Sequence, residues 1–391
     1  MKIKSIKQVK KIKGKRVLVR VDFNVPLVGN NKIGKSEDFR IIRALPTINY
    51  LIKQEAKVIL ISHLGRPKGK VDWRYSLKPV AKKLSQLLKQ KVILSPEVIG
   101  KQTNQLVKSL KNNEVLMLEN VRFHPSEEKN CKRFAKQLAK LGDLYVNDAF
   151  AVSHRAQSSV SAITEFLSSY AGFLMEEEIE NLNKILTNPQ QPLIVIIGGA
   201  KISTKIKVIK NFTKVAKKIL LGGALANTFL KFIGVGVGKS PIEPDTFPEL
   251  KKIKLTDNQI VVPIDGLMAA NLQAKKARID AMGDVKENEL VLDIGPDTIK
   301  LYQNILQSAK MVMWNGPMGL IENPIFAKGT KSLIKFLANC SARVIVGGGE
   351  TVQMIRKMNL ENKFYFISTG GGAMLEFLEG KKLPGLKNII Q

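Results

Sequence analysis

The feature that most constrains the fold is a repeated pattern of short apolar runs alternating with segments of helical spacing. The runs are rich in Val, Ile and Leu, and they end in small or polar residues. They lie at 17–23, 58–64, 92–95, 115–121, 144–150, 193–199, 218–224, 260–265, 311–316, 343–349 and 364–372. Because parallel strands buried on both faces read as continuous apolar runs, the pattern predicts a doubly wound α/β fold.

The chain is too long for one such sheet. At 391 residues it exceeds what a single core usually supports. A helix-like stretch that starts near Met175 has an acidic first turn and ends at two prolines. We therefore predict two doubly wound parallel-sheet (Rossmann-like) domains joined by a hinge helix. The predicted boundaries are 1–174, 175–191 for the connector, 192–378, and 379–391 for a C-terminal tail.

The composition is strongly basic, with a formal net charge of +30 at pH 7. A basic surface is typical of nucleic-acid binding. Here, however, the lysines are scattered over most helical segments and have no aromatic residues interleaved. We interpret them mainly as solvated faces and expect no specific nucleic-acid site. A basic α/β protein with weak or no enzymatic activity that binds nucleic acid or other polyanions stays open as the alternative.

Targeting and cysteine patterns point to an ordinary intracellular protein. No apolar stretch approaches the length of a membrane span, and the lysine-rich start has no continuous apolar region of a secretory signal. Cys131 and Cys340 are the only cysteines, and they have no metal-ligand spacing. We expect a cytoplasmic protein without a membrane partner.

The residues that follow the predicted strands differ between the two halves of the chain. The first half has arginine, histidine, acid and amide groups after its strands, and the second half has glycines. Arginine forks match phosphate and carboxylate geometry, whereas glycine lets backbone approach a base and a polyphosphate closely. This contrast predicts one small, multiply anionic substrate and one nucleotide, each bound by its own domain.

Two glycine-rich stretches carry further expectations. Residues 364–378 run from a strand through Gly370–Gly372 into a helix, which predicts backbone amides that face an anion. Lys201 and Lys205 follow Gly198-Gly199 and are expected on one face of the first turn of a helix, where a bound phosphate would offset the helix dipole. The P-loop-like residues 233–240 lack the first glycine and precede Pro241, so we reject that motif.

A series of motifs then resembles one family over essentially the whole chain. They are RVDFNVP, DFRIIRALPTI, SHLGRPKG, ENVRFHPSEE, VNDAFAVSHRAQSS, IIGGAKISTK, MWNGPMGLIENP, VGGGET and STGGGAMLEFLEGKKLPGL. In this order they resemble the phosphoglycerate kinases. The resemblance implies reversible phosphoryl transfer between ATP and 3-phosphoglycerate, giving ADP and 1,3-bisphosphoglycerate, the ATP-forming step of glycolysis. It also implies a monomer whose C-terminal tail returns to the N-terminal domain.

The resemblance also implies roles for individual residues. It assigns the binding of 3-phosphoglycerate to Asp22, Phe23, Asn24, Arg40, His63, Arg66, Arg122 and Arg155. It assigns catalysis, around the phosphoryl group in flight, to Arg40, Lys201 and Lys205. We expect the backbone amides of the triple glycine, with Gly371 and Gly372, to help neutralise the same group. The resemblance assigns the nucleotide site to Lys205, Gly199, Gly223, Asn315, Glu322, Gly347, Gly348, Gly349, Glu350 and Thr351, with Glu322 on the ribose.

Magnesium is the implied cofactor, bound as Mg-ATP or Mg-ADP. Glu350 stands where the family usually has aspartate, and we expect it to serve the metal despite its extra methylene group. The sequence GGALAN at 222–227 also departs from the usual family pattern. Because water would divert the phosphoryl group to hydrolysis, we expect in-line transfer after hinge closure.

Overall fold

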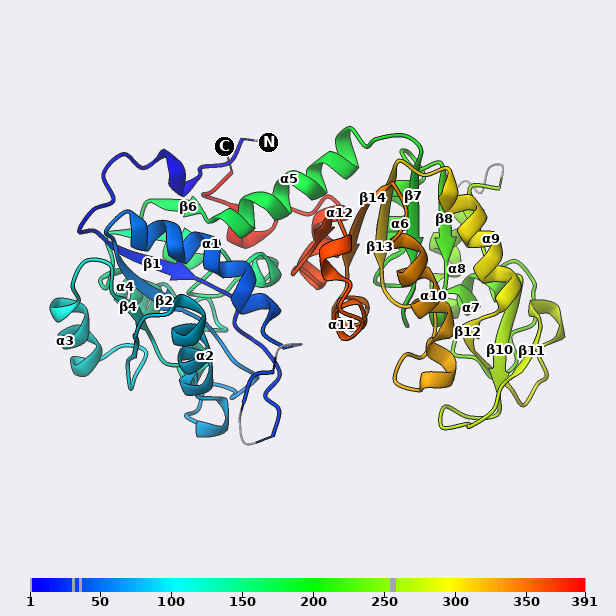
Figure 1. Ribbon diagram of the computed structural model, residues 1–391, viewed down its shortest axis with the longest axis horizontal. Helices are drawn as coiled ribbons and strands as arrows, with labels where there is room; N and C mark the ends of the chain where they lie inside the picture. Colours follow the sequence, from blue (N-terminus) through cyan, green and yellow to red (C-terminus); the bar gives the residue numbers. More distant parts are fainter. Residues whose placement is uncertain (1, 30–31, 35–36, 254–257, 391) are drawn as a thin grey trace. The chain divides into compact units, whose positions relative to one another are not determined.

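The structure is a computed structural model that describes residues 2–29, 32–34, 37–253 and 258–390. The chain divides into two compact units. Unit 1 contains Met1–Glu180 and Gly380–Gln391, and unit 2 contains Asn181–Glu379. Gln391, the last residue of the predicted tail, lies outside the described residues. Each unit holds a six-stranded parallel sheet with helices around it, so the predicted fold class is confirmed (Figure 1).

The sheet of unit 1 has the strand order β3-β4-β2-β1-β5-β6. Its strands are β1 (Arg16–Arg20), β2 (Lys57–Ile61), β3 (Val92–Leu94), β4 (Val115–Met117), β5 (Leu144–Asn147) and β6 (Ser169–Ala171). Its helices are α1 (Phe39–Lys53), α2 (Lys78–Leu88), α3 (Lys101–Ser109) and α4 (Lys132–Ala139). β1 lies in the centre and pairs with β2 on one side and β5 on the other.

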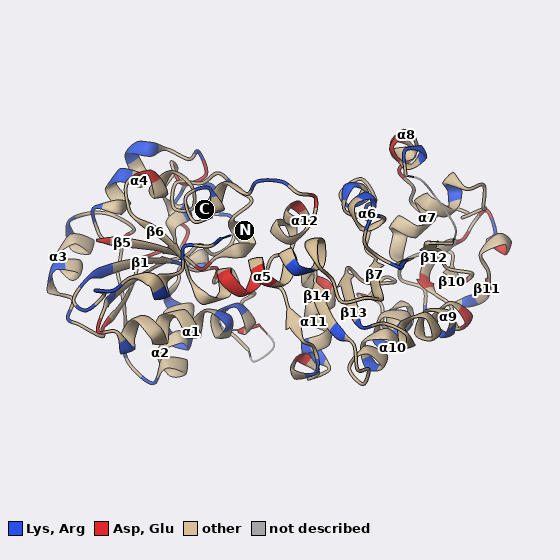
Figure 2. Cartoon of the chain, turned by 90° about the horizontal axis from the view of Figure 1, so that it is seen from above, with Lys and Arg blue, Asp and Glu red and all other residues tan. Residues whose placement is uncertain are grey.

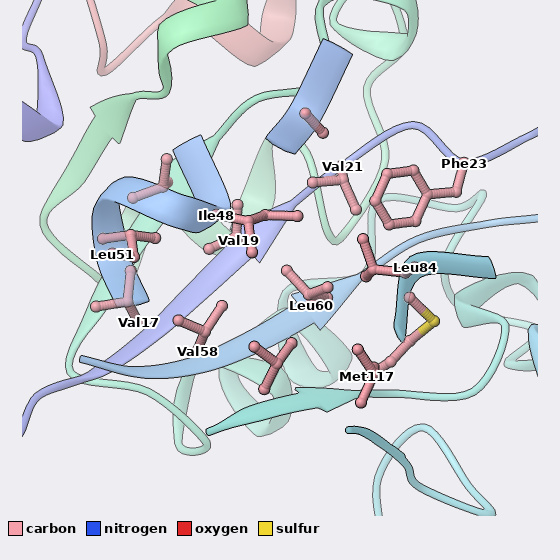
Figure 3. Close-up of a cluster of buried hydrophobic side chains, with 14 of the residues drawn as sticks. Val17, Val19, Val21, Phe23, Ile48, Leu51, Val58, Leu60, Leu84 and Met117 are labelled. Carbon is pink, nitrogen blue, oxygen red and sulfur yellow. The ribbon is translucent and has the colours of Figure 1, made fainter. Parts of the chain in front are cut away.

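Alternate residues of these strands enter two separate cores. Val17, Val19 and Val21 lie in the cluster that also contains Ile48 and Leu51 of α1 and Leu84 of α2 (Figure 3). The intervening Leu18 lies in a second cluster with Ile59 and with residues of α3 and α4. Because successive side chains of a strand point to opposite faces, the consecutive apolar residues Val17, Leu18 and Val19 of this central strand supply both cores.

Unit 2 has a second parallel sheet, of order β15-β14-β13-β7-β8-β9. Its strands are β7 (Leu193–Ile197), β8 (Lys218–Leu221), β9 (Ile260–Val261), β13 (Met311–Asn315), β14 (Arg343–Gly347) and β15 (Phe366–Ile367). Its helices are α6 (Ile206–Phe212), α7 (Gly223–Phe232), α8 (Phe247–Lys251), α9 (Pro296–Gln307), α10 (Lys328–Leu337), α11 (Gly349–Lys357) and α12 (Gly372–Leu378).

Unit 2 also contains an antiparallel sheet that the sequence pattern did not predict. Its order is β11-β10-β12, with β10 (Asp265–Ala269), β11 (Arg278–Ala281) and β12 (Leu290–Ile294). The apolar run at 260–265 was expected as one strand, but β9 ends at Val261 and β10 begins at Asp265. Exposed and half-buried residues alternate along β11, so one face of this strand is in contact with solvent. A strand of this kind has few apolar residues, and its sequence signal is therefore weak.

The connecting helix and the chain ends complete the architecture. α5 (Phe173–Thr187) begins in unit 1 and ends in unit 2, because the boundary between the units falls after Glu180. The segment from Gly380 onward belongs to unit 1, where Ile390 pairs with Ile3 and Gly385 N donates to Ser153 O over 2.9 Å. The last residues are therefore held by the N-terminal unit through backbone contacts.

Buried aspartates accept hydrogen bonds from first-turn N–H groups of three helices, of which α9 and α10 have Gly295 and Ala327 at their N-cap positions. Asp265 accepts hydrogen bonds from Asp297 N and Thr298 N at the start of α9, and Asp293 accepts one from Gly329 N in α10. Asp148, which follows β5, accepts one of 3.2 Å from Met175 N in α5. A side-chain oxygen here satisfies N–H groups that the helix leaves free.

Basic side chains are spread over the helices of both units, among them α2, α4, α6 and α10 (Figure 2). Of the helices in the described part of the chain, none has both the length and the apolar character that crossing a membrane requires.

Candidate active site

In unit 1, Asp22 joins the residues that follow β1 to helix α1. Its Oδ2 accepts a 2.8 Å hydrogen bond from Arg40 Nη1, and the same nitrogen donates to Asn24 O over 3.1 Å. Burial has the largest single effect and raises the pKa of the Asp22 carboxyl, but Arg40 and the other nearby groups, including Arg20 and the N–H of Asn24, together lower it by more, so the net pKa lies below the ordinary value. Asp22 is therefore an anion that orients Arg40.

The same cluster continues to the residues after β2 and β4. Asn24 Oδ1 accepts a 2.9 Å bond from Gly65 N, and Gly65 O accepts a 2.8 Å bond from Arg122 Nη1. Phe23 is fully buried, and its N–H donates to Ser62 Oγ over 3.0 Å. Asn24, which follows β1, and Arg122, which follows β4, are thus joined through Gly65, and Phe23 is fixed separately to the residue after β2.

Arg122 is a buried cation only partly satisfied by the protein. Its pKa is lowered to about 10, mainly by burial and also by the charges of Arg155 and Arg20, while the nearby Glu128 acts in the opposite direction. Its Nη2 is buried and has no hydrogen-bond partner among the described residues. A buried guanidinium nitrogen without a partner is costly, so this position is suited to an anionic ligand.

The other two predicted arginines are less constrained. Arg155 is half-buried, and its Nε contacts His154 Nε2 at 3.3 Å. Its charge acts on Arg122, which places the two guanidinium groups near each other. Arg66 is exposed.

His63 lies in the centre of this cluster and is almost completely buried. Its Nδ1 is 3.3 Å from Arg20 Nη2 and 3.7 Å from Asp22 Oδ1. Burial lowers the pKa of His63 well below its ordinary value, Asp22 raises it, and Arg20 and Arg122 lower it again. The imidazole is therefore neutral near pH 7.

Sequence reasoning missed the layer behind these residues. Arg20 is fully buried, and it donates to Ser159 Oγ over 3.0 Å; Ser159 Oγ in turn donates to the buried Glu127 over 2.6 Å. One feature of the sequence could have indicated it. Arg20 lies between apolar residues of the run at 17–23, all of which are expected to be buried. An arginine there needs a buried partner.

In unit 2 the segments that follow β7, β8 and β13 are joined by backbone hydrogen bonds. Gly198 N donates to Asn315 O, Gly199 N to Pro317 O and Gly223 N to Met318 O, over 2.8 to 2.9 Å. Gly199, Gly223 and Gly316 have positive φ angles of 99°, 65° and 91°. A Cβ atom on Gly316 would lie 2.5 Å from Gly198 O and 2.6 Å from Lys205 Nζ. Only glycine permits this approach.

Lys205 is the buried cation of this glycine-rich region. Its Nζ donates to Gly198 O, and burial lowers its pKa to about 8, while the charge of Glu350 raises it. The expected placement of the two lysines was wrong, because α6 begins at Ile206 and Lys201 is an exposed residue before it. A turn at 202–205 separates them, so they do not share a helical face.

The remaining predicted nucleotide residues lie around the starts of α11 and α12. Asn315 is buried, and its Nδ2 lies 3.9 Å from Met374 Sδ. Gly347 ends β14, Gly348 is the N-cap of α11, and Gly349 and Glu350 are exposed in its first turn. Thr351 is fully buried, and its Oγ1 has no hydrogen-bond partner in the described part of the chain. Glu322 is exposed in the segment after β13.

Gly371 is the N-cap of α12 with φ +47°, and no atom would lie within 4 Å of a Cβ placed on it. Gly372 is the first residue of that helix. The space around Gly371 shows that its positive φ, and not crowding, requires glycine there.

One small hollow in unit 2, which includes Gly223, was not predicted. It is lined by α7, the antiparallel sheet and the segment after β13, and its residues include Gly223, Asn227, Pro263, Leu292 and Met318. Asn227 is buried, and its Nδ2 has no partner among the described residues. The hollow has a volume of about 10 Å³, which is room for about one water molecule, so it is not by itself a ligand site. Because GGALAN at 222–227 departs from the usual family pattern, the sequence did not single out Asn227.

Two parallel α/β units, one with arginines and the other with glycines and a lysine at the strand ends, define a phosphotransferase that binds two anionic substrates. A family model described as phosphoglycerate kinase matches residues 6–381. A phosphoglycerate kinase of Coprothermobacter proteolyticus is 46% identical over 100% of this chain and 99% of its own.

Solved structures are similar as well. A phosphoglycerate kinase from Coxiella burnetii superposes with a TM-score of 0.84 at 38% identity, covering 99% of both chains. One from Pyrococcus horikoshii has a TM-score of 0.87 at 32% identity, covering 99% of this chain and 98% of its own. The chain belongs to the phosphoglycerate kinase family. The resemblance in the motif series is thereby confirmed.

Proposed function

We propose that this enzyme transfers a phosphoryl group reversibly between ATP and 3-phosphoglycerate, giving ADP and 1,3-bisphosphoglycerate. The observation that carries the proposal is the family match over nearly the whole chain. The alternative of a basic binding protein without kinase activity is not favoured by that match. The geometry of each unit supports the assignment of one substrate to it.

Unit 1 is proposed to hold 3-phosphoglycerate. Arg122, with a free buried nitrogen, and the nearby Arg155 would bind the existing phosphate together with Arg66. Asn24, Asp22 and the neutral His63 would orient the rest of the molecule. Arg40 is one-third exposed and held by Asp22, so its other nitrogens can reach a ligand.

Unit 2 is proposed to hold the nucleotide. Its glycines at the ends of β7, β8, β13 and β14 allow backbone to approach phosphates, and Glu322 would bind the ribose. Lys205, and Lys201 before it, would neutralise charge on the group in transfer, with the amides of Gly371 and Gly372. Phosphoryl transfer needs positioning and neutralisation more than covalent help, and a carboxylate acceptor needs no general base.

Magnesium is the proposed cofactor. No group of three or more His, Cys, Asp or Glu side chains suited to a metal occurs among the residues that the structure describes. That finding fits Mg²⁺, which is often bound by one or two carboxylates together with substrate phosphates. Glu350 is exposed in the first turn of α11, and its charge reaches Lys205. When bound, the metal would neutralise phosphate charge.

We further propose closure about α5 before transfer, since the two substrates bind to different units and water must be excluded. We propose as well a monomer that acts in the cytoplasm. These points come from the family resemblance and from the division into two units.

A coupled assay tests the proposal directly. Purified enzyme with ATP, MgCl₂ and 3-phosphoglycerate should release ADP, and omission of 3-phosphoglycerate should abolish that release. His63→Gln serves as a variant of the same fold with weakened substrate binding. Absence of ADP release by folded protein, together with affinity for duplex DNA at physiological salt, would favour the binding-protein alternative.

A further inference from the structure

Arg20 is a cationic side chain that is fully buried. Each of its three guanidinium nitrogens contacts another group of the protein. Nε donates to Ser159 Oγ over 3.0 Å, Nη1 donates to Val21 O, and Nη2 lies 3.3 Å from His63 Nδ1. Its side chain is among the largest fully buried ones in the protein. The guanidinium is thus held on three sides, and one of them is a histidine of the proposed substrate site.

Ser159 is itself fixed by two further groups. Its Oγ donates to Glu127 Oε1 over 2.6 Å, and its N–H donates to Glu127 Oε2 over 3.0 Å. Its carbonyl accepts a 2.8 Å bond from Tyr145 OH. Because Ser159 Oγ gives its proton to Glu127, it can only accept from Arg20. The hydrogen bonds run in one direction, from the guanidinium through the serine to a buried carboxylate.

The contact between Arg20 and His63 decides the state of the imidazole. A guanidinium has only donors, so Nη2 can make a favourable contact with Nδ1 only if that nitrogen has its lone pair free. The other candidate partner of Nδ1, Asp22 Oδ1, is 3.7 Å away, beyond hydrogen-bond length. We propose that Arg20, anchored by Ser159 and Glu127, is a positioning residue that holds His63 as the neutral tautomer with its proton on Nε2.

The consequence for function rests on the proposed phosphoglycerate kinase activity. In this tautomer His63 presents one N–H donor and no net charge. It can therefore donate to an oxygen of the anionic substrate without adding to the repulsion among Arg20, Arg40 and Arg122. The opposite tautomer would present a lone pair at Nε2 and repel the same oxygen.

The first test needs neither substrate nor activity. The full chain has only three histidines, so ¹⁵N-histidine labelling and a long-range ¹H–¹⁵N correlation spectrum near pH 7 can resolve each ring. The His63 signals are assigned by their loss in His63→Gln. We expect a protonated Nε2 and an unprotonated Nδ1. A proton on Nδ1, or on both nitrogens, overturns the proposal.

The second test removes the anchor. Ser159→Ala deletes the hydroxyl that joins Arg20 to Glu127, and we expect the two His63 tautomers to exchange. Loss of one hydrogen bond should raise KM for 3-phosphoglycerate about fivefold with kcat changed less than about twofold. Ser158→Ala is the matched control, because Ser158 Oγ donates to Ser126 O and Cys131 O instead. It should behave as wild type.

Glu127→Gln keeps the shape of the anchor and should reproduce the tautomer exchange. It serves as a second variant if Ser159→Ala does not fold. A single Nε2–H tautomer in both folded variants would overturn the role of the anchor. If the tautomer is as expected but the wild type has no kinase activity, the proposed function fails while the positioning of His63 stands.

Discussion

The two parallel sheets of this chain have similar strand orders, but the residues at their strand ends differ in chemical character. In each, the first strand lies in the centre, β1 between β2 and β5 and β7 between β8 and β13. Ligands of such sheets bind beyond the carboxyl ends of the strands where the order reverses. Unit 1 has long charged side chains there, fixed by buried partners such as Asp22. Unit 2 has glycines whose backbones nearly touch.

The difference shows two ways of binding an anion with the same scaffold. Charged side chains in unit 1 supply direction and selectivity, but each needs buried partners to hold it. Backbone amides in unit 2 need no partner, but they require positions without a Cβ atom. If this contrast is correct, unit 1 should be sensitive to loss of charge and unit 2 to the addition of one methyl group.

The largest effect is expected from Gly316→Ala. The new Cβ atom would lie 2.5 Å from Gly198 O at φ +91°, and the combined clash and strain should weaken ATP binding about 100-fold. Isothermal titration measures the affinity. Gly236→Ala, with no atom within 4 Å of its Cβ, is the control. A change below threefold in a folded Gly316→Ala protein would contradict the backbone-built site.

Arg122→Met should give the next largest effect, in the other unit. It keeps the stem but removes a buried charge, and we expect affinity for 3-phosphoglycerate to fall about 30-fold. ATP affinity should not change. The exposed Arg133→Met provides a matched loss of charge. Equal weakening by both arginine variants would show that general charge, and not this site, attracts the substrate.

Lys205→Ala is the exception within the glycine-rich unit, because it removes the one buried cation described there beside Gly198. Loss of an electrostatic contact to the group in transfer should lower turnover at least about tenfold. The exposed Lys207→Ala should retain wild-type turnover. A fully active Lys205→Ala enzyme would remove this lysine from the catalytic set.

The pKa of Lys205 gives a related pH dependence. Because that pKa is about 8, the ammonium loses its proton as pH rises through 8, and ATP affinity of the wild type should then decline. Lys205→Ala should have a flat profile over the same range. Titrations from pH 7 to pH 9 compare the two, and parallel profiles would assign the decline to another group.

The smallest functional effect is expected at Asp148, which caps α5. Burial raises its pKa from 3.8 to about 7, so the native state holds a proton that the unfolded chain releases between these values. Stability from this group is present at low pH and is lost as pH rises to about 7. Relative to Asp148→Asn, the wild type should lose up to about 1.4 kcal/mol per pH unit.

Urea unfolding from pH 4 to pH 7 measures this difference, and turnover of Asp148→Asn should stay near wild type. The exposed Asp245→Asn should show no such slope. A constant difference between wild type and Asp148→Asn across the range would mean that Asp148 is ionised throughout.

Much of the fold followed from local patterns. Strand β7 is apolar at every position and β1 is apolar between its two terminal arginines, and this pattern depends only on burial of both faces. The antiparallel sheet of unit 2 was not predicted because β11 has only four residues and one solvent-exposed face, so it has no continuous apolar run. The placement of Lys201 was wrong for a similar reason, since a turn at 202–205 interrupts the helical spacing on which the expectation depended.

The sequence by itself determined the α/β class, the division of the chain into an arginine half and a glycine half, and the family. Each of these depends on residues near one another in the chain. Only the tertiary structure decided how the charges are held. Arg20 meets Ser159 across 139 positions, and Ser159 meets Glu127 across 32. Ser159 and Glu127 lie in turns, and they meet Arg20 of β1 only when the folded unit brings these distant segments together, so no local pattern encodes the contacts.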